Sequence, residues 1–190
     1  MDSRNIEEFA EFGEGYTDNN AALSKRMTNT LRFAGEHLAK DTNVLDLGVP
    51  SLLSAKMIAQ GLRVTNTDTD VDLDLDYSVV ENDAFEAVTA FEILEHLVSP
   101  FPLLKNIKAP KLLASIPLKL WFVSAYWNDD NPYDCHYHEF ESRQFDMLLN
   151  KAGWKILKSE KWTSAPTSLG IRPLLRRITP RYYIVYCERS

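Results

Sequence analysis

The chain has 190 residues, enough for one well-packed domain and too few for two of ordinary size. Its net charge of −6, with charged residues at 25% of the chain, argues against a general nucleic-acid binder or a protein that adheres to anionic membranes. No apolar run approaches the roughly 20 residues of a membrane-spanning helix, and the acidic stretch 1–14 lacks the apolar core of a signal peptide, so we expect a cytoplasmic protein.

Helical and strand patterns alternate along the first half of the chain. Apolar residues at a three-to-four spacing predict an amphipathic helix over residues 17–39, the main part of an N-terminal helical cap, 1–42. Short apolar runs predict strands at 43–47 and 62–67, with a helix capped by Ser51 between them. This alternation is typical of strands that pair in parallel.

The second half continues the alternation and closes with two β-type runs. The predicted order is strand, helix, strand, helix and an antiparallel pair of strands, at residues 87–91, 99–108, 111–116, 142–152, 154–162 and 181–188. We therefore predict a single α/β domain over residues 1–190, with a doubly wound, mostly parallel sheet and an antiparallel C-terminal strand.

Acidic residues and a glycine stand where the first two predicted strands end. Asp46 and Gly48 close the first strand, and Asp68 closes the second, about 20 residues further on. A glycine lets the chain turn sharply under a ligand, and a carboxylate at the second strand end can accept both hydroxyls of a ribose. The structural alternative is that both aspartates only cap turns.

The strand ends and the segments around them resemble class I S-adenosylmethionine-dependent methyltransferases, in particular the branch of small-molecule O-methyltransferases. The likeness covers about residues 43–158 and is carried by Val44–Gly48, Asp68, Phe85–Leu97, Leu113–Pro117 and His138–Trp154. It implies a Rossmann-like methyltransferase fold and S-adenosylmethionine as the cofactor.

The resemblance also implies roles for individual residues. Asp46 and Gly48 would approach the methionine end of the cofactor, and Asp68 would hold its ribose. Phe91 and Glu92, at the end of the strand 87–91, would line the methionine pocket.

The glycine-rich turn of that family is degenerate in this chain. The family has a D-x-G-x-G-x-G turn, whereas Pro50 and Leu52 here replace two of the glycines, and proline also lacks a backbone donor. The helix that the family has after its second strand is reduced to the short stretch 69–71. These departures imply weak cofactor affinity, a differently built pocket, or loss of cofactor binding.

Aspartates occupy every second position from residue 68 to residue 76. On a strand all of them would share one face, which predicts a short edge strand with a charged solvent face. A calcium loop does not fit, because Leu73 stands where the loop needs glycine and the terminal glutamate is absent.

Glu92, Glu95 and His96 have the spacing of one side of a helix start, and His136 and His138 follow further along the chain. This pattern resembles the metal site of small-RNA 2′-O-methyltransferases, in which a cation polarises a ribose hydroxyl. The same Glu-His-Leu sequence occurs in metal-free members of the wider family, and we predict no metal. His96 and His138 are instead the candidate catalytic bases, with a structural role as the alternative for each.

The aromatic segment 117–140 stands where that family inserts a substrate-covering element. Trp121, Tyr126 and Trp127 would hold a planar or apolar acceptor, or else form the core of the insertion itself. The arginines between residues 172 and 181 would bind an anionic acceptor or form a solvated face.

Methyl transfer from S-adenosylmethionine to a small-molecule acceptor is therefore the predicted function. The alternatives are a catalytically inactive methyltransferase-like binding module and a metal-assisted RNA 2′-O-methyltransferase, against which the acidic net charge counts. Because methyl transfer requires mainly positioning and at most one proton transfer, residue types alone do not identify the acceptor.

Overall fold

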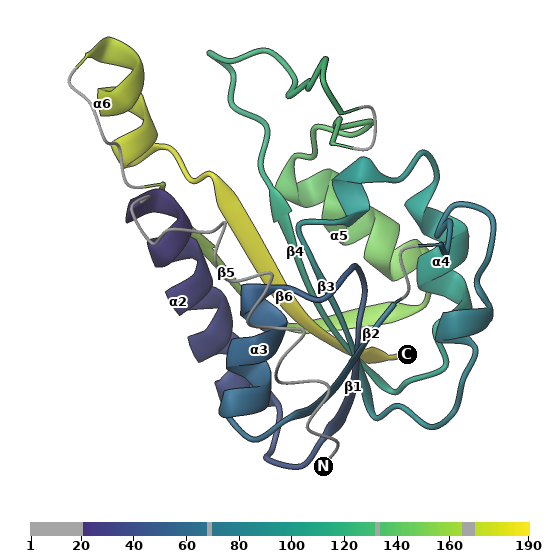
Figure 1. Ribbon diagram of the computed structural model, residues 1–190. Helices are drawn as coiled ribbons and strands as arrows, with labels where there is room; N and C mark the ends of the chain where they lie inside the picture. The colour runs from purple at the N-terminus through teal and green to yellow at the C-terminus, as the bar shows by residue number, and fades with distance from the viewer. Residues whose placement is uncertain (1–20, 68–69, 132–133, 165–169) are drawn as a thin grey trace.

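The computed structural model describes residues 21–67, 70–131, 134–164 and 170–190, and its strands form one six-stranded sheet (Figure 1). The sheet order is β2-β1-β3-β4-β6-β5. The strands are β1 Asn43–Asp46, β2 Arg63–Asn66, β3 Ala87–Phe91, β4 Lys111–Pro117, β5 Trp154–Trp162 and β6 Tyr182–Arg189. Strands β2, β1, β3 and β4 pair in parallel, whereas β6 is antiparallel to β4 and β5. The predicted fold class is confirmed.

Helices cover both faces of this sheet. Figure 1 shows α2 (Ala21–His37) and α3 (Leu52–Ala59) on one face and α4 (Pro100–Asn106) and α5 (Ser142–Lys151) on the other. Helix α6 (Ile171–Ile178) follows β5 and precedes β6 along the chain, and it lies beyond the end of the sheet (Figure 1). The 3-10 turns η1 and η2 span Ser78–Val80 and Leu94–His96. Among the described helices, none has both the length and the apolar character needed to span a bilayer.

Strands β3 and β4, at the centre of the sheet, are buried because helices pack on both faces of the sheet. Successive side chains of β4 point to opposite faces. Leu112 packs in the cluster that contains Phe145 and Trp154, under α4 and α5, whereas Leu113 packs with Phe33 under α2. Apolar residues on both sides of these strands thus contribute to one of two cores, which is why the strands read as nearly continuous apolar runs.

Most predicted elements are found near their expected bounds. Strand β3 has the predicted residues, and Ser51 caps α3 by accepting from the backbone N–H of Ser54 at 3.2 Å. The predicted helix 17–39 is present as α2, and its expected first turn, before residue 21, lies outside the described residues.

The predicted edge strand at 68–76 is wrong for residues 70–76, which form turns. The backbone N–H of Asp76 donates to the carbonyl of Asp72 at 2.8 Å. The Asp74 carboxylate accepts from the backbone N–H groups of Val98 and Ser99 at 2.9 and 2.8 Å, which ties this loop to the start of α4. Local carboxylate-to-backbone bonds therefore replace the expected ladder.

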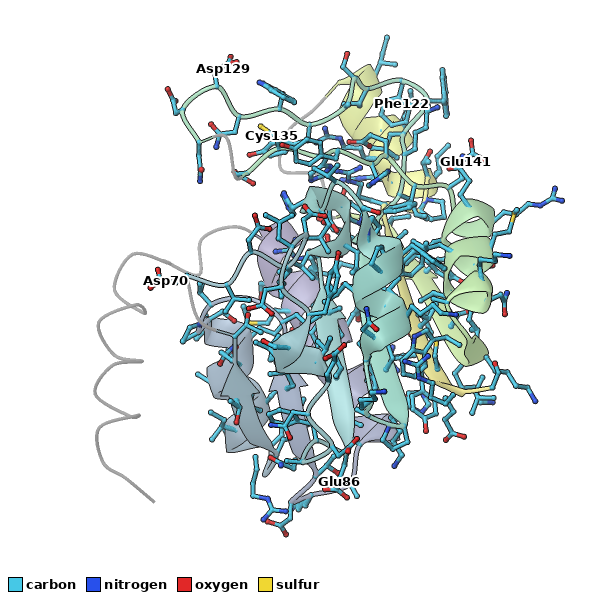
Figure 2. The ribbon with its side chains drawn as sticks, turned by 90° about the vertical axis from the view of Figure 1, so that its right-hand side faces the viewer. Asp70, Glu86, Phe122, Asp129, Cys135 and Glu141 are labelled. Carbon is cyan, nitrogen blue, oxygen red and sulfur yellow. The ribbon has the colours of Figure 1, made fainter. Side chains whose placement is uncertain are left out.

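The parallel strands all end at one edge of the sheet, which we call the carboxyl edge. In Figure 2, Phe122, Asp129 and Cys135 lie at this end of the molecule, and Glu86, which precedes β3, lies at the opposite end. The segment 118–140 therefore leaves β4 and extends over the carboxyl edge, and a bridge between Leu118 and Phe140 closes its base.

Candidate functional site

The carboxyl end of β1 is built around the buried carboxylate of Asp46, which is 6% exposed. One oxygen accepts from Thr89 Oγ1 at 2.5 Å, and the other accepts from Ser54 Oγ at 2.8 Å and Asn66 Nδ2 at 3.1 Å. Burial raises the pKa of Asp46, and these three donors oppose the rise because they stabilise the charged form. Asp46 thus joins β1 to β2, β3 and α3.

The turn after β1 depends on Gly48. Its φ of +112° lies in the left-handed region, and a Cβ there would stand 3.3 Å from Ile93 Cδ1. Its N–H donates to Thr67 Oγ1 at 2.7 Å, and its carbonyl accepts from Asn66 Nδ2 at 3.3 Å. The turn therefore lies against both the end of β2 and the segment after β3. It does so even with Pro50 in place of one of the family's glycines.

The predicted ribose acid, Asp68, lies outside the described residues. The residues before it, Asn66 and Thr67, bind the Gly48 turn, and sequence reasoning missed both of them. Their place at the end of the second strand was the available signal, because side chains there meet the turn that follows the neighbouring parallel strand.

Glu92 closes β3 in the left-handed backbone conformation, with φ of +54°, which is uncommon for a residue that carries a side chain. Its carboxylate accepts from Ser115 Oγ at 2.9 Å and from Arg26 Nη1 at 3.3 Å. Burial raises the pKa of Glu92, and the Arg26 guanidinium opposes that rise. Phe91, beside it, is partly buried against the core under α2. Arg26 comes from α2 and had no signal in the sequence.

Glu95 and His96 lie on the 3-10 turn η2, and Glu92 precedes that turn. The expected helix face shared by Glu92, Glu95 and His96 is therefore not formed. Instead, the backbone N–H groups of Tyr137 and His138 donate to the carbonyl of Glu95 at 2.8 and 3.2 Å, which holds the inserted segment against η2.

Glu95, His96 and His136 lie together at this junction, with one potential ligand atom from each within 4.8 Å of the others. Glu95 is 1% exposed, and its Oε2 has no hydrogen-bond partner in the part of the chain that the structure describes. Burial, together with the nearby Glu92 carboxylate, raises the pKa of Glu95 well above its usual value. The imidazoles of His96 and His136 meet edge to face, with ring centroids 4.9 Å apart.

His138, the other predicted base, lies apart from this cluster. Its Nε2 is 3.1 Å from the carbonyl oxygen of Val98, and its ring stacks on Phe140. The side chains of His136 and His138 thus diverge, and His136 is the one that reaches His96.

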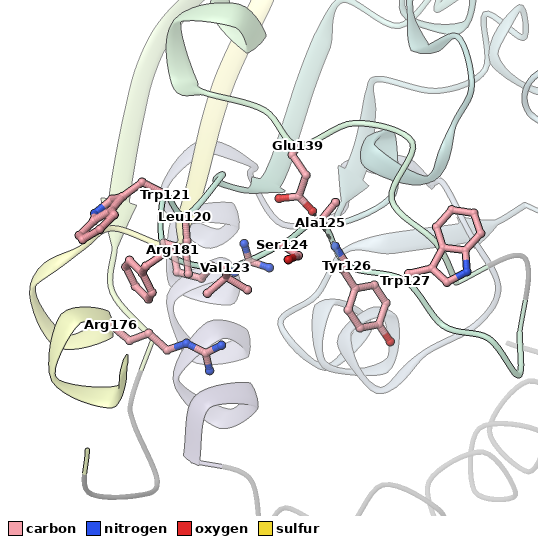
Figure 3. Close-up of a pocket in the computed structure, with 11 residues that line it drawn as sticks. Leu120, Trp121, Val123, Ser124, Ala125, Tyr126, Trp127, Glu139, Arg176 and Arg181 are labelled. Carbon is pink, nitrogen blue, oxygen red and sulfur yellow. Dashed lines mark hydrogen bonds between the residues drawn. The ribbon is translucent and has the colours of Figure 1, made fainter. Parts of the chain in front are cut away.

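A cavity of about 740 Å³ lies along the inserted segment, lined by Leu120, Trp121, Phe122, Val123, Ser124, Ala125, Tyr126, Trp127, Glu139, Arg176 and Arg181. Figure 3 shows Trp121 and Trp127 at opposite ends of it, and they are 76% and 64% exposed, so they neither face each other nor form a core. Glu139 Oε1 accepts from the backbone N–H of Tyr126 and lies 3.0 Å from His136 Nδ1, which connects the cavity to the Glu95 cluster.

No family model and no curated protein matches this sequence, whereas solved structures match the fold. The 1,6-didemethyltoxoflavin-N1-methyltransferase of Burkholderia thailandensis, solved with 1,6-didemethyltoxoflavin and S-adenosylhomocysteine bound, matches with a TM-score of 0.63 and 19% identity over 99% of this chain and 86% of that one. The N-methyltransferase NodS of Bradyrhizobium japonicum WM9 matches with a TM-score of 0.57 and 11% identity over 92% and 99% of the two chains.

The [4+2]-cyclase SpnF also matches, with a TM-score of 0.52 and 15% identity over 87% of this chain and 81% of that one. The chain therefore has the fold of class I S-adenosylmethionine-dependent methyltransferases, which a cyclase also has. At these identities the likeness concerns the fold, and the chemistry has to be argued from the site.

Proposed function

We propose that this chain binds S-adenosylmethionine at the carboxyl edge and transfers its methyl group to a small-molecule acceptor. The observation that carries the proposal is how closely the turn at Gly48 approaches Ile93: a Cβ added at Gly48 would stand 3.3 Å from the Ile93 side chain. The glycine turn after β1 therefore lies beside the segment that follows β3, and open α/β sheets bind ligands in the crevice at such strand ends. The Burkholderia neighbour, which holds S-adenosylhomocysteine, supports the choice of ligand.

The predicted cofactor residues have distinct roles in this proposal. Gly48 lets the methionine end of the cofactor pass close to the backbone, and Phe91 and Glu92 line its pocket. Asp68 accepts hydrogen bonds from the ribose hydroxyls. Asp46 is a positioning residue, because protein donors already bind both of its oxygens.

The bound cofactor supplies an electrophilic methyl group on a sulfonium sulfur. The residues of this chain orient the acceptor, exclude water and take up a proton when the acceptor atom carries one. His96 and His138 are the proposed bases. Burial lowers the pKa of His96, which keeps its ring neutral, and because its Nδ1 donates to the carbonyl of Cys135 at 3.1 Å, Nε2 is the atom that accepts.

The cavity along the inserted segment is the proposed acceptor site, and it would make 117–140 a substrate-covering insertion within a single domain. Arg176 and Arg181 place guanidinium groups in its wall, and Tyr126 and Trp127 add aromatic surface (Figure 3). We propose a planar or anionic acceptor, because aromatic rings stack on planar groups and guanidinium groups bind carboxylates and phosphates.

Calorimetric titration with S-adenosylhomocysteine tests the cofactor site, and two glycine variants make the test specific. Gly48→Ala and Gly61→Ala place equally strained Cβ atoms, at φ of +112° and +97° and each 3.3 Å from a neighbouring side chain. Gly61 lies between α3 and the start of β2, so it is at the end of the sheet opposite the carboxyl edge. We expect Gly48→Ala to weaken binding at least about tenfold and Gly61→Ala to leave it unchanged, although both lower the melting temperature.

Two results would contradict the cofactor site. One is the absence of heat and of a thermal shift with the native chain at millimolar S-adenosylhomocysteine. The other is an equal loss of affinity in both glycine variants while both remain folded.

A second candidate is a methyltransferase-like binding module without catalysis. The observation that favours it is the turn itself, in which Pro50 offers no donor and the Gly48 N–H already donates to Thr67. This candidate predicts no saturable heat from the cofactor, so the same titration separates the two. A metal-assisted RNA 2′-O-methyltransferase remains the least favoured function, because the net charge of −6 opposes a polyanionic substrate.

A further inference from the structure

We propose that Glu95, His96 and His136 bind a divalent transition-metal cation through one carboxylate oxygen and the Nε2 atoms of the two imidazoles. Zinc is the ion that this donor set fits best, because two histidines and one carboxylate leave a fourth position open for water or a substrate atom.

The buried carboxylate of Glu95 is the first argument. Glu95 is 1% exposed, and its Oε2 has no hydrogen-bond partner among the described residues. A buried carboxylate oxygen without a partner is costly, and buried charged groups in proteins are usually paired or coordinate a metal. His96 Nε2 lies 3.9 Å from Glu95 Oε1, beyond hydrogen-bond distance. A cation between the three side chains would neutralise the carboxylate.

The second argument is the orientation of the two imidazoles. His96 Nδ1 lies 3.1 Å from the carbonyl oxygen of Cys135, and His136 Nδ1 lies 3.0 Å from Glu139 Oε1. A carbonyl or a carboxylate only accepts, so each Nδ1 carries the proton and each Nε2 keeps its lone pair. Metal-binding histidines almost always have this arrangement, in which the second ring nitrogen donates to a carbonyl or carboxylate.

The distances require only a small closure. One potential ligand atom from each of the three side chains lies within 4.8 Å of the others, and His96 Nε2 lies 3.9 Å from Glu95 Oε1. Ligand atoms held at about 2 Å from a tetrahedral zinc lie about 3.3 Å apart. Side-chain rotations that move each ligand atom by less than about 1 Å therefore complete the site. The backbone is already fixed, because Tyr137 donates to the carbonyl of Glu95 at 2.8 Å and so holds the two ligand segments together.

The neighbouring acidic and imidazole side chains are occupied elsewhere. Glu92 accepts from Ser115 and Arg26, and His138 Nε2 lies 3.1 Å from the carbonyl oxygen of Val98. The proposed site therefore differs from the Glu92, Glu95, His96 grouping that the sequence pattern favoured. With a cation bound, His96 is a ligand, and His138 is then the remaining candidate base.

The site also stands next to the cavity, since Glu139 lines the cavity and holds His136. If the proposed methyl transfer is correct, the open position of the metal can bind the acceptor oxygen and lower its pKa. This role of the metal in methyl transfer rests on the proposed function, whereas metal binding itself does not.

Zinc binding by the full chain, measured without cofactor or acceptor, tests the proposal. We expect one equivalent of Zn²⁺ per chain by competition with a chromogenic chelator, and a visible absorption spectrum of low coordination number with Co²⁺. Glu95→Gln, His96→Gln and His136→Gln should each weaken binding at least about 100-fold, and Glu139→Gln, which removes only an outer partner, about 10- to 100-fold. His37→Gln and His138→Gln are matched controls, expected to stay within about threefold.

Folding of each variant is checked by circular dichroism and by its melting temperature without metal, so that a loss of binding is read only from folded protein. The proposal is overturned if the native chain retains no zinc at equimolar concentration. It is also overturned if the control histidine variants lose as much affinity as the ligand variants, or if folded Glu95→Gln binds as tightly as the native chain.

Discussion

Asp46 shows how one buried side chain can organise a strand end. Three donors from β2, β3 and α3 meet its carboxylate. From the sequence, we expected Asp46 to lie at a strand end and close to a bound ligand. It did not predict the donors, because Ser54, Asn66 and Thr89 are ordinary polar residues whose meeting depends on strand register and not on local pattern.

The Asp46→Asn variant tests this arrangement through the pH dependence of stability. Burial raises the pKa of Asp46 above its unfolded value of 3.8, so between the two pKa values the folded chain binds more protons than the unfolded chain. Its contribution to stability therefore falls as pH rises through that window. We expect the cost of Asp46→Asn, about 1–3 kcal/mol near pH 4, to shrink toward neutral pH in urea unfolding.

Asp76 provides the control of opposite sign. The backbone N–H of Ser78 donates to its carboxylate at 2.9 Å and lowers its pKa, so its contribution is lost as pH falls. The cost of Asp76→Asn should accordingly grow with pH. An Asp46→Asn cost that also grew with pH would mean that the donors outweigh burial, contrary to this account.

At the scale of elements, α2 supports the end of β3 through the ion pair of Arg26 with Glu92, in addition to the apolar packing of Phe91. Arg26 pairs with Glu92 at 3.3 Å, whereas Arg32, six residues further along the same helix, pairs with Glu36 and Glu160 at the exposed surface. Glu92 is the more buried carboxylate, so its partner matters more.

Two substitutions in α2 measure that difference. Arg26→Ala should cost about 1–2 kcal/mol in denaturant unfolding and raise the pKa of Glu92, because it removes the nearest cation from a buried carboxylate. Arg32→Ala changes helix propensity equally and should stay within about 1 kcal/mol, since exposed ion pairs contribute little. Equal costs for the two variants would show that α2 does not stabilise Glu92.

The elements also show where sequence reasoning succeeds. Strand β3 was predicted with its observed bounds because a parallel strand buried on both faces is a continuous apolar run. The stretch 70–76 was predicted wrongly because alternation has the same appearance in a strand and in a loop in which Asp72, Asp74 and Asp76 accept from backbone N–H groups. The shared helix face expected for Glu92, Glu95 and His96 does not form, because Glu92 has a positive φ and a 3-10 turn begins only after it, at Leu94.

At the scale of the whole molecule, the carboxyl edge gathers groups from distant parts of the chain. Gly48, Glu92 and Glu95 come from the strand ends, His136 and Glu139 come from the inserted segment, and Arg181 lies just before β6. The parallel topology, which the sequence predicted, explains the first group. The inserted segment has no hydrophobic period, so its contacts with η2 and with the cavity became visible only in the structure.

A crystal structure of the chain grown with S-adenosylhomocysteine is the decisive test of the proposed cofactor site. We expect the ligand across the carboxyl ends of β1 and β2, with its amino-acid end beside Gly48 and Glu92 and its ribose hydroxyls on Asp68. The proposed site is wrong if the ligand binds only elsewhere, or if the Asp68 carboxylate is directed away from a bound nucleoside while Pro50 fills its place.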